Sequence, residues 1–278
     1  MRSLEKVVED IKSVKVQGAK EIAIYSLKFL KEFCKENGFG LKFEVAAKVL
    51  EDARPTAVVL HNCLEILKKE KRIRTFDKLI KQLDKATKRI AKNGSRLIKS
   101  GYKIMTHCHS GEALAVIKKA RNEGKRISIF ATITEPLEQG VRTAKELAKL
   151  KIPVTLITDN AAGFFVKDVD CVLVGADAIR VDSKELINKT GTLLLALAAN
   201  EFKKPFYVAA NTLKIDRRKK FIIEERPAKE IRQELIRPGK LEGIKIRNPA
   251  FDRVPLRYVK NIITEKGVFK PKEILRMR

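Results

Sequence analysis

The hydrophobic pattern of the sequence changes near residue 98, and this change constrains the fold more than any other feature. Before that position, apolar residues recur every three to four positions, for example at Ile22, Tyr25, Phe29 and Phe33. This is the period of an amphipathic helix. The pattern therefore predicts a helical domain over residues 1–98, with breaks at 37–40, at 54–55 and near 72–75.

From residue 99 onward, short apolar runs alternate with stretches of helical spacing. The apolar runs cover 103–107, 127–133, 154–158, 171–176, 206–210 and 262–264. The helical stretches between the earlier runs cover 112–122, 141–150 and 191–202. This alternation is typical of a parallel sheet covered on both faces, in which ligands bind at the carboxyl ends of strands. We therefore predict an α/β fold, with a helical N-terminal domain over 1–98 and a mostly parallel sheet domain over 99–278. The charged segment 217–245 is expected to be an irregular surface loop.

The chain carries 60 Lys and Arg against 34 Asp and Glu, which gives a formal net charge of +26 over 278 residues. A surface this basic attracts polyanions such as RNA, acidic proteins or phosphorylated small molecules. The sequence has no aromatic RNA-binding strand and no zinc-finger spacing, so a solvated basic surface is favoured over specific nucleic-acid binding. Abundant Lys, Arg and Glu, with four Gln and no Trp, also resemble a heat-adapted, thermophile composition.

The cysteines and the apolar segments indicate the cellular compartment. Four widely spaced cysteines without a C-x-x-C pair fit neither a disulfide scaffold nor a zinc ribbon. No stretch approaches the roughly 18 uncharged apolar residues of a transmembrane helix, and the charged N-terminus lacks the apolar core of a signal peptide. We therefore expect a cytoplasmic protein with no membrane partner.

A polar turn, T-H-C-H-S-G at 106–111, joins the first predicted strand to the next helix. Free backbone N–H groups at a helix start favour an anion such as phosphate, and Ser110 and the glycine suit that task. The helix end and two histidines are expected to lower the pKa of the Cys108 thiol, for proton transfer or nucleophilic attack. Such a cysteine by itself is more often a small buried hydrophobe, but its polar neighbours favour a functional role. Metal binding by His107 and His109 is less attractive, because no further ligand cluster is evident.

Asp177 ends another apolar run, V-L-V-G-A-D at 172–177. An acidic residue in this place commonly serves as a general acid or base, and partial burial raises its pKa toward neutrality. A helix cap or an acceptor for a sugar hydroxyl is the alternative. Downstream, Asn188 and Lys189 precede another predicted helix, where they hold hydroxyl and phosphate oxygens or form an ordinary helix entry. Neither G-x-G-x-x-G nor G-x-x-x-x-G-K-[ST] occurs, which disfavours classical dinucleotide binding and P-loop hydrolysis.

Short motifs follow one another over nearly the whole chain: Q-G-A, R-P-T-A-V, T-H-C-H-S, P-L-E-Q-G, G-A-D-A-I, I-N-K-T-G-T, N-P-A-F-D and I-I-T-E-K-G-V. In this order the sequence resembles the archaeal ribose-1,5-bisphosphate isomerases. They belong with the methylthioribose-1-phosphate isomerases and the alpha, beta and delta subunits of translation initiation factor 2B. The T-H-C-H-S form points toward the ribose bisphosphate branch. The resemblance implies a Rossmann-like C-terminal domain and a homo-oligomer built from dimers, either a dimer or a hexamer.

The resemblance also implies an activity, the aldose-to-ketose isomerisation of ribose 1,5-bisphosphate to ribulose 1,5-bisphosphate in AMP breakdown. It implies no metal and no cofactor. Cys108 and Asp177 match the catalytic pair of the family. One of them acts as the acid at the ring oxygen and the other assists hydrogen transfer between C1 and C2, and either assignment is open. The positions that match substrate-binding residues are Gln17, Gly18, Ala19, Arg54, Ser110, Gln139, Asn188, Lys189 and Lys214.

The sequence departs from the family pattern at four positions. Gln17 replaces a usual Arg, Ile133 and Glu135 replace the Glu and Arg of T-E-T-R-P, and Asn211 replaces a usual Glu. The alternative hypothesis is therefore a regulatory subunit of the initiation factor 2B type, which binds a nucleotide or sugar phosphate without turnover and contacts initiation factor 2. A general RNA-binding protein is the third hypothesis. The isomerase is preferred, because a binding protein has no evident need for both Cys108 and Asp177.

Overall fold

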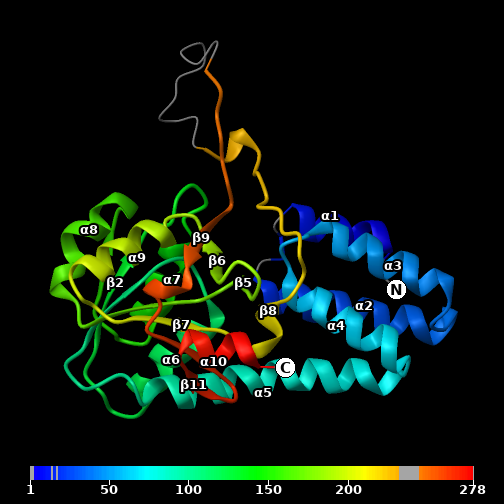
Figure 1. The fold of residues 1–278 in the computed structure, drawn as a ribbon, viewed down its shortest axis with the longest axis horizontal. Coiled ribbons are helices and arrows are strands. Elements are labelled where there is room, and N and C mark those ends of the chain that lie inside the picture. The colour runs from blue at the N-terminus through cyan, green and yellow to red at the C-terminus, as the bar shows by residue number, and fades with distance from the viewer. Residues whose placement is uncertain (1–2, 14, 17, 232–243, 278) are drawn as a thin grey trace.

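The computed structural model describes residues 3–13, 15–16, 18–231 and 244–277. Five helices come first along the chain: α1 (Leu4–Lys12), α2 (Ala19–Asn37), α3 (Leu41–Ala53), α4 (Val58–Glu70) and α5 (Ile73–Ser95). The helix ends agree with the predicted breaks, since α2 ends before Gly38 and α3 ends before the Arg54-Pro55 pair. In Figure 1, α1 to α4 form one lobe, and α5 runs from this lobe along the other.

The first four helices and the start of α5 share one apolar core. Its largest fully buried side chains include Leu27 and Leu30 of α2, Phe43 of α3, Leu64 of α4 and Phe76 of α5. These residues recur on one side of each helix, as the sequence pattern predicts. The core fixes the two segments of the helical lobe that reach the site described below, the start of α2 and the end of α3.

The described residues of the second half of the chain form two sheets. The larger has the strand order β11-β10-β7-β4-β1-β2-β3 and is parallel except for the β10–β11 pair. Its strands are β1 (Lys103–Thr106), β2 (Ser128–Thr132), β3 (Val154–Ile157), β4 (Cys171–Val174), β7 (Phe206–Ala209), β10 (Asn261–Thr264) and β11 (Gly267–Phe269). The smaller sheet, β8-β5-β6-β9, contains β5 (Ala178–Arg180), β6 (Glu185–Lys189), β8 (Ile215–Asp216) and β9 (Phe251–Pro255).

Helices cover both faces of the large sheet. They are α6 (Gly111–Asn122), α7 (Gln139–Lys149), α8 (Ala162–Phe165), α9 (Thr192–Glu201) and α10 (Pro271–Arg276). One face packs against the late part of α5 and against α6 and α7, through residues such as Ile90, Val116 and Leu147. The other face packs against α9 and α10, through Leu195 and Ile274. The predicted α/β class with a mostly parallel sheet is therefore confirmed.

The strand order reverses at the centre of the large sheet. The chain runs from β1 outward to β2 and β3, and then returns to place β4 on the other side of β1. Crevices at such a reversal are the usual ligand sites of open α/β sheets. The carboxyl ends of β1 and β4, which lead to Cys108 and Asp177, therefore lie at the switch point.

The sequence analysis did not predict the smaller sheet. Asn188 and Lys189 were expected at a helix entry, but they are the last two residues of β6, and α9 begins at Thr192. The segment 217–245 is mostly irregular where it is described, with a bridge between Glu225 and Pro249 and a short 3-10 turn at Ala228–Glu230. The division into domains at residue 98 remains a prediction. No described helix is both long and apolar enough to cross a bilayer.

Candidate active site

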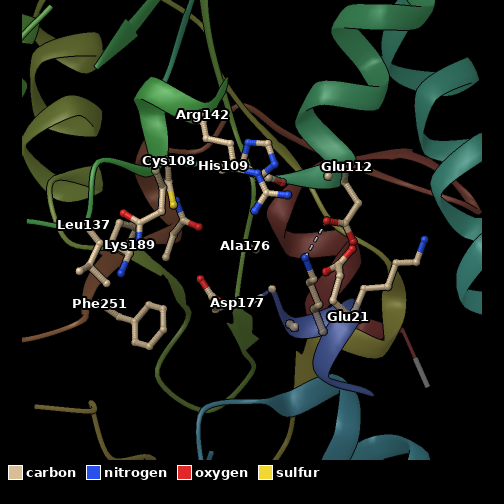
Figure 2. A pocket seen from close by; sticks show the side chains of 18 of the residues that line it. Glu21, Cys108, His109, Glu112, Leu137, Arg142, Ala176, Asp177, Lys189 and Phe251 are labelled. Carbon is tan, nitrogen blue, oxygen red and sulfur yellow. Dashed lines mark hydrogen bonds and ion pairs between the residues drawn. The ribbon is translucent and has the colours of Figure 1, made fainter. Parts of the chain in front are cut away.

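A cavity of about 170 Å³ lies where the helical lobe meets the switch point of the large sheet. Figure 2 shows the side chains of Cys108 and Asp177 pointing into this cavity, with Lys189 beside the thiol. The lining comes from the start of α2, the end of α3, the loops after β1 and β4, the end of β6 and the segment around Arg226. Residues as far apart in the chain as Gly18 and Phe251 therefore meet in one place.

Backbone hydrogen bonds hold Cys108 in place. The residue has a backbone φ of 67°, which is uncommon for a residue other than glycine. Its N–H donates to Thr134 Oγ1 at 2.9 Å, and its carbonyl accepts from Thr143 Oγ1 at 2.9 Å. Both backbone groups are thus satisfied by threonines that lie near β2 and on α7. This arrangement fixes the thiol at the edge of the cavity.

The expected lowering of the Cys108 pKa is wrong. The pKa of this thiol is raised to about 11, chiefly by burial and to a smaller extent by Asp177, although the positive charge of Lys189 acts in the opposite direction. Loss of hydration disfavours a thiolate more than the nearby charge favours it. The thiol is therefore protonated at neutral pH.

Asp177 follows β4 and Ala176, and its N–H donates to the carbonyl of Ile187 at 2.8 Å. Burial raises the pKa of this carboxyl, while Lys214, Lys189 and Arg54 lower it. The direction agrees with the expectation from sequence, and the cause is the same loss of hydration. The cavity thus holds two weakly acidic groups whose protonated forms are favoured by burial.

Close packing joins the loops after β1 and β4. A Cβ added at Gly175 would lie 2.2 Å from Ser110 Oγ and 2.5 Å from Ser110 Cβ. A side chain at this position would therefore push the β1–α6 loop away from β4. Glycine at 175 therefore allows the two loops to pack closely, so that Cys108 and Asp177 line the same cavity.

Two helices begin at the cavity. α2 starts at Ala19 after Gly18, and α6 starts at Gly111 after Ser110. Ser110 Oγ accepts from the N–H of Ala113 at 3.3 Å, so the hydroxyl proton remains available to a ligand. The unpaired N–H groups and dipoles of two helix N-termini create a positive potential that favours phosphate oxygens.

The cavity lining contains six cationic residues against three acidic ones. The cations are Lys20, Arg54, Arg142, Lys189, Lys214 and Arg226, and the acids are Glu21, Glu112 and Asp177. Some of these charges are already paired within the protein. Lys214 Nζ donates to Glu112 Oε2 at 2.9 Å, and both side chains are buried. The surplus of positive charge suits a ligand with more than one negative charge.

The two histidines of the β1–α6 loop have structural contacts. His107 Nε2 lies 2.8 Å from the carbonyl oxygen of Thr190, so this nitrogen carries the proton. His107 Nδ1 lies 2.7 Å from Thr132 Oγ1, and burial lowers the pKa of the ring. His109 Nδ1 lies 2.9 Å from Thr143 Oγ1. In the described part of the chain, no group of three or more His, Cys, Asp or Glu residues is arranged to hold a metal ion.

Ten of the eleven predicted site residues line this cavity, and their functional roles remain predictions. The ten are Gly18, Ala19, Arg54, Cys108, Ser110, Gln139, Asp177, Asn188, Lys189 and Lys214. Gln17 lies outside the described residues. Of the departures from the family pattern, Glu135 is exposed, and Asn211 Nδ2 donates to Glu112 Oε1 at 2.9 Å.

Sequence reasoning missed nine residues of the lining: Lys20, Glu21, His109 as a lining residue, Glu112, Leu137, Arg142, Ala176, Arg226 and Phe251. Glu112 had a signal, since it directly follows Ser110 and Gly111 at the predicted anion-binding turn. Phe251 is paired with Lys189 across β6 and β9, and the lysine ammonium lies 5.3 Å from the ring centroid. Arg226 had no signal, because its segment has no regular hydrophobic period.

Fold and cavity together define a class: an α/β protein with a Rossmann-like sheet and a cavity with surplus positive charge at the switch point. A model described as the initiation factor 2 subunit family matches residues 15–271. The chain belongs to this family, which confirms the resemblance seen in the sequence.

Curated relatives match almost the full chain. The ribose 1,5-bisphosphate isomerase of Archaeoglobus fulgidus is 41% identical over 288 residues, which cover 98% of this chain and 91% of the relative. The protein of the same name from Methanocaldococcus jannaschii is 41% identical over 289 residues, covering 98% and 92%. The methylthioribose-1-phosphate isomerase of Geobacter metallireducens is 47% identical over 180 residues, covering 59% of this chain and 52% of that relative.

Solved structures share the fold over the whole chain. Translation initiation factor eIF-2B from Pyrococcus horikoshii OT3 has a TM-score of 0.87 at 27% identity and covers 98% of both chains. The 5-methylthioribose 1-phosphate isomerase of the same organism has a TM-score of 0.73 at 28% identity, covering 99% of this chain and 86% of that chain. The fold therefore occurs in proteins named for isomerisation and in proteins named for translation initiation.

Proposed function

We propose that the chain is an aldose–ketose isomerase that converts ribose 1,5-bisphosphate to ribulose 1,5-bisphosphate. One observation carries this proposal: Cys108 and Asp177 line the same cavity at the switch point, within a surplus of positive charge. The near-full-length relatives named ribose 1,5-bisphosphate isomerase support it. The regulatory alternative of the initiation factor 2B type is not favoured.

The reaction needs two proton-transferring groups and no outside oxidant. In the closed sugar, C1 carries a phosphate ester and the ring oxygen, so the ring opens when an acid protonates that oxygen and the C1–O bond breaks. A hydrogen then moves with its bonding electron pair from C2 to the electron-poor C1, while the C2 hydroxyl loses its proton. C2 is oxidised to the ketone and C1 is reduced, so atoms and electrons balance within the substrate. Cys108 and Asp177 divide these proton transfers between them.

The surrounding groups hold the substrate and neutralise its charge. A sugar bisphosphate carries several negative charges, which Arg54, Lys189 and Lys214 compensate through charge-assisted hydrogen bonds. The start of α6 adds backbone N–H groups and the Ser110 hydroxyl. Fixed positive groups of this kind also stabilise the negative charge that develops on the C2 oxygen as it loses its proton.

The test follows ketose formation from ribose 1,5-bisphosphate by NMR. We expect turnover by the unmodified protein and a loss of at least about 100-fold in Cys108→Ser and in Asp177→Asn. Cys34→Ser is the matched control, because Cys34 is buried in α2 away from the cavity, and this variant keeps its activity. Absence of turnover, or undiminished turnover in both cavity variants, would contradict the proposal.

We also propose that the chain forms a homo-oligomer through the outer face of α8 and α9. Phe164, Leu194 and Leu197 are exposed there, at 65%, 70% and 40%. The sequence of α9, TLLLALAANE, is apolar on all sides, which is typical of a helix buried on all sides. Large exposed apolar side chains on neighbouring helices are suited to a symmetric contact between two copies.

A further inference from the structure

The cluster of Arg54, Arg226, Glu224 and Glu230 lies at the rim of the cavity. Arg54 comes from the end of α3 in the helical lobe, and the other three come from the irregular segment after β8. Both arginines line the cavity, whereas neither glutamate does. The two arginines therefore face a ligand while the carboxylates lie behind them.

One carboxylate joins the two arginines. Glu224 Oε2 lies 3.0 Å from Arg54 Nε, and Glu224 Oε1 accepts from Arg226 Nη1 at 2.7 Å. The three side chains are 12–20% exposed, so the surrounding protein shields these ion pairs from water. Glu230 holds the other edge of Arg226, accepting from Nε at 3.1 Å and also from Nη2. Arg226 is thus fixed from both sides.

Main-chain hydrogen bonds fix the same segment. The N–H of Arg226 donates to the carbonyl of Asn248 at 2.8 Å, and the N–H of Ala250 donates to the carbonyl of Glu224 at 2.9 Å. Ala250 directly precedes Phe251, the first residue of β9 and part of the cavity lining. The backbone at Arg226 is therefore tied to the small sheet that carries Lys189.

Both guanidinium groups keep donors for a ligand. Arg54 Nη1 is buried and has no hydrogen-bond partner among the described residues. An unpaired buried donor is costly, which is unusual unless a ligand satisfies it. A guanidinium has five N–H donors, and within the described part of the chain the hydrogen bonds from Nε, Nη1 and Nη2 of Arg226 use three, so two remain.

We propose that Arg226 is a further substrate-binding residue, which holds one phosphate group of the sugar bisphosphate together with Arg54. Glu224 is the positioning residue that keeps the two guanidinium groups side by side. This inference rests on the proposed function, because it names the group of the substrate that the rim binds. Two adjacent planar guanidinium groups match the tetrahedral array of oxygens on a phosphate better than a single lysine does.

Binding without turnover tests the role of Arg226. Calorimetry with the product, ribulose 1,5-bisphosphate, compares the unmodified protein with Arg226→Gln, Arg226→Lys and the control Arg247→Gln. Arg247 lies in the same segment and pairs with Glu225, but it does not line the cavity. We expect affinity to fall by roughly 10- to 100-fold in Arg226→Gln, the size of a lost hydrogen bond to a charged group. Arg226→Lys is expected to lose less affinity, and the affinity of Arg247→Gln is expected to stay within about twofold of that of the unmodified protein.

The outcomes separate this inference from the isomerase proposal. Unchanged affinity in Arg226→Gln, or an equal loss in Arg247→Gln, would overturn the role of Arg226. Product binding without any turnover of the aldose would contradict only the isomerase. If the unmodified protein does not bind the bisphosphate, both proposals fail. If Arg226→Gln does not fold, the affinity of Arg226→Lys is the deciding measurement, because lysine keeps the positive charge but lacks the planar guanidinium group. An affinity equal to that of the unmodified protein would then overturn the proposal.

The positioning role of Glu224 has its own readout. In Glu224→Gln the charge that joins the arginines is lost, so we expect KM for ribose 1,5-bisphosphate to rise by about tenfold while kcat changes little. A residue that only stabilised the fold would lower the melting temperature and leave KM unchanged. That result, or a loss confined to kcat, would overturn the positioning role.

Discussion

Loss of hydration has the largest effect on the pKa values of Cys108 and Asp177, which both line the cavity. Burial raises the pKa of both Cys108 and Asp177, even though Lys189 stands close to each of them. A protein that reacted through a free thiolate would need the opposite shift. The residues are therefore suited to exchanging protons with a bound substrate, and poorly suited to nonspecific reaction with electrophiles in solution.

The reactivity of Cys108 tests this directly. Since its pKa is raised to about 11, the thiolate is a minor species at neutral pH, and alkylation by iodoacetamide is expected to be slow. The rate rises about tenfold per pH unit until the thiol titrates. Peptide mapping by mass spectrometry separates Cys108 from the other three cysteines. Fast alkylation at neutral pH that levels off below about pH 8, near the value of an ordinary thiol, would contradict the assignment.

His107 makes folding stability depend on pH. Burial lowers its pKa in the folded protein, so the unfolded chain, with an ordinary pKa of about 6.5, takes up the proton first as pH falls. Above that pH, this group therefore does not affect the free energy of unfolding. As the pH drops below it, the free energy of unfolding decreases by about 1.4 kcal/mol per pH unit for such a group. Urea titrations over this range check the slope.

The matched variant for this prediction is His107→Gln, which does not titrate. We expect a shallower dependence of the unfolding free energy on pH, because only the partly buried His109, whose pKa is also lowered, still contributes from this loop. The same slope in the variant and the unmodified protein would contradict the account.

At the scale of secondary-structure elements, close packing between a helix and a strand sets the shape of the site. α7 begins at Gln139, a predicted substrate-binding residue, and its next residue, Gly140, lies against the end of β2. A Cβ at Gly140 would lie 1.6 Å from the carbonyl oxygen of Thr132. The start of α7 can keep this position only with glycine at 140.

Gly140→Ala is therefore expected to destabilise the protein by roughly 1–3 kcal/mol, since either α7 or β2 must move. The matched control is Gly163→Ala in α8, where an added Cβ meets nothing within 4 Å. This control is expected to be neutral or slightly stabilising, because alanine favours a helix over glycine. Denaturant unfolding of both variants makes the comparison, and equal stability would show that α7 does not pack as described.

How far the sequence predicts these elements depends on the strength of each pattern. β4 is short and wholly apolar, and β1 has the apolar pair Ile104 and Met105 at its centre, so both strands and the positions of Cys108 and Asp177 were predictable. β5, β6 and β9 pair in a small, mostly antiparallel sheet whose strands alternate weakly, and they were missed. Arg226 was also missed, because long-range contacts, such as its backbone hydrogen bond to Asn248, place it at the cavity.

At the scale of the whole molecule, the site depends on the contact between the helical lobe and the sheets. Asn62 of α4 donates to the carbonyls of Leu213 and Ile215 at 2.8 and 3.0 Å, which holds the turn that carries Lys214. Arg54 reaches the same cavity from α3. Figure 1 shows α5 running along both parts, so the two halves share one long helix.

The outer face of α8 and α9 gives a second prediction at this scale. We expect light scattering to show a dimer or larger assembly, and Leu194→Glu to reduce its mass, because a charge in an apolar contact is costly. Leu41→Glu is the control, since Leu41 is an equally exposed leucine at the start of α3, 80% against 70% for Leu194, and this variant keeps at least the dimer. A monomer in the unmodified protein, or an unchanged mass in Leu194→Glu, would contradict the proposed interface.

The central claim is that a thiol and a carboxylate act as one unit on a bound sugar bisphosphate. The most direct measurement is the rate of ribulose 1,5-bisphosphate formation by Cys108→Ser, Asp177→Asn and the double variant, each compared with the unmodified protein. Groups that act in one reaction are strongly non-additive, so the double variant is expected to be no more than about tenfold slower than the worse single variant. Losses that simply multiply in the double variant, or a single variant that retains full activity, would contradict the account.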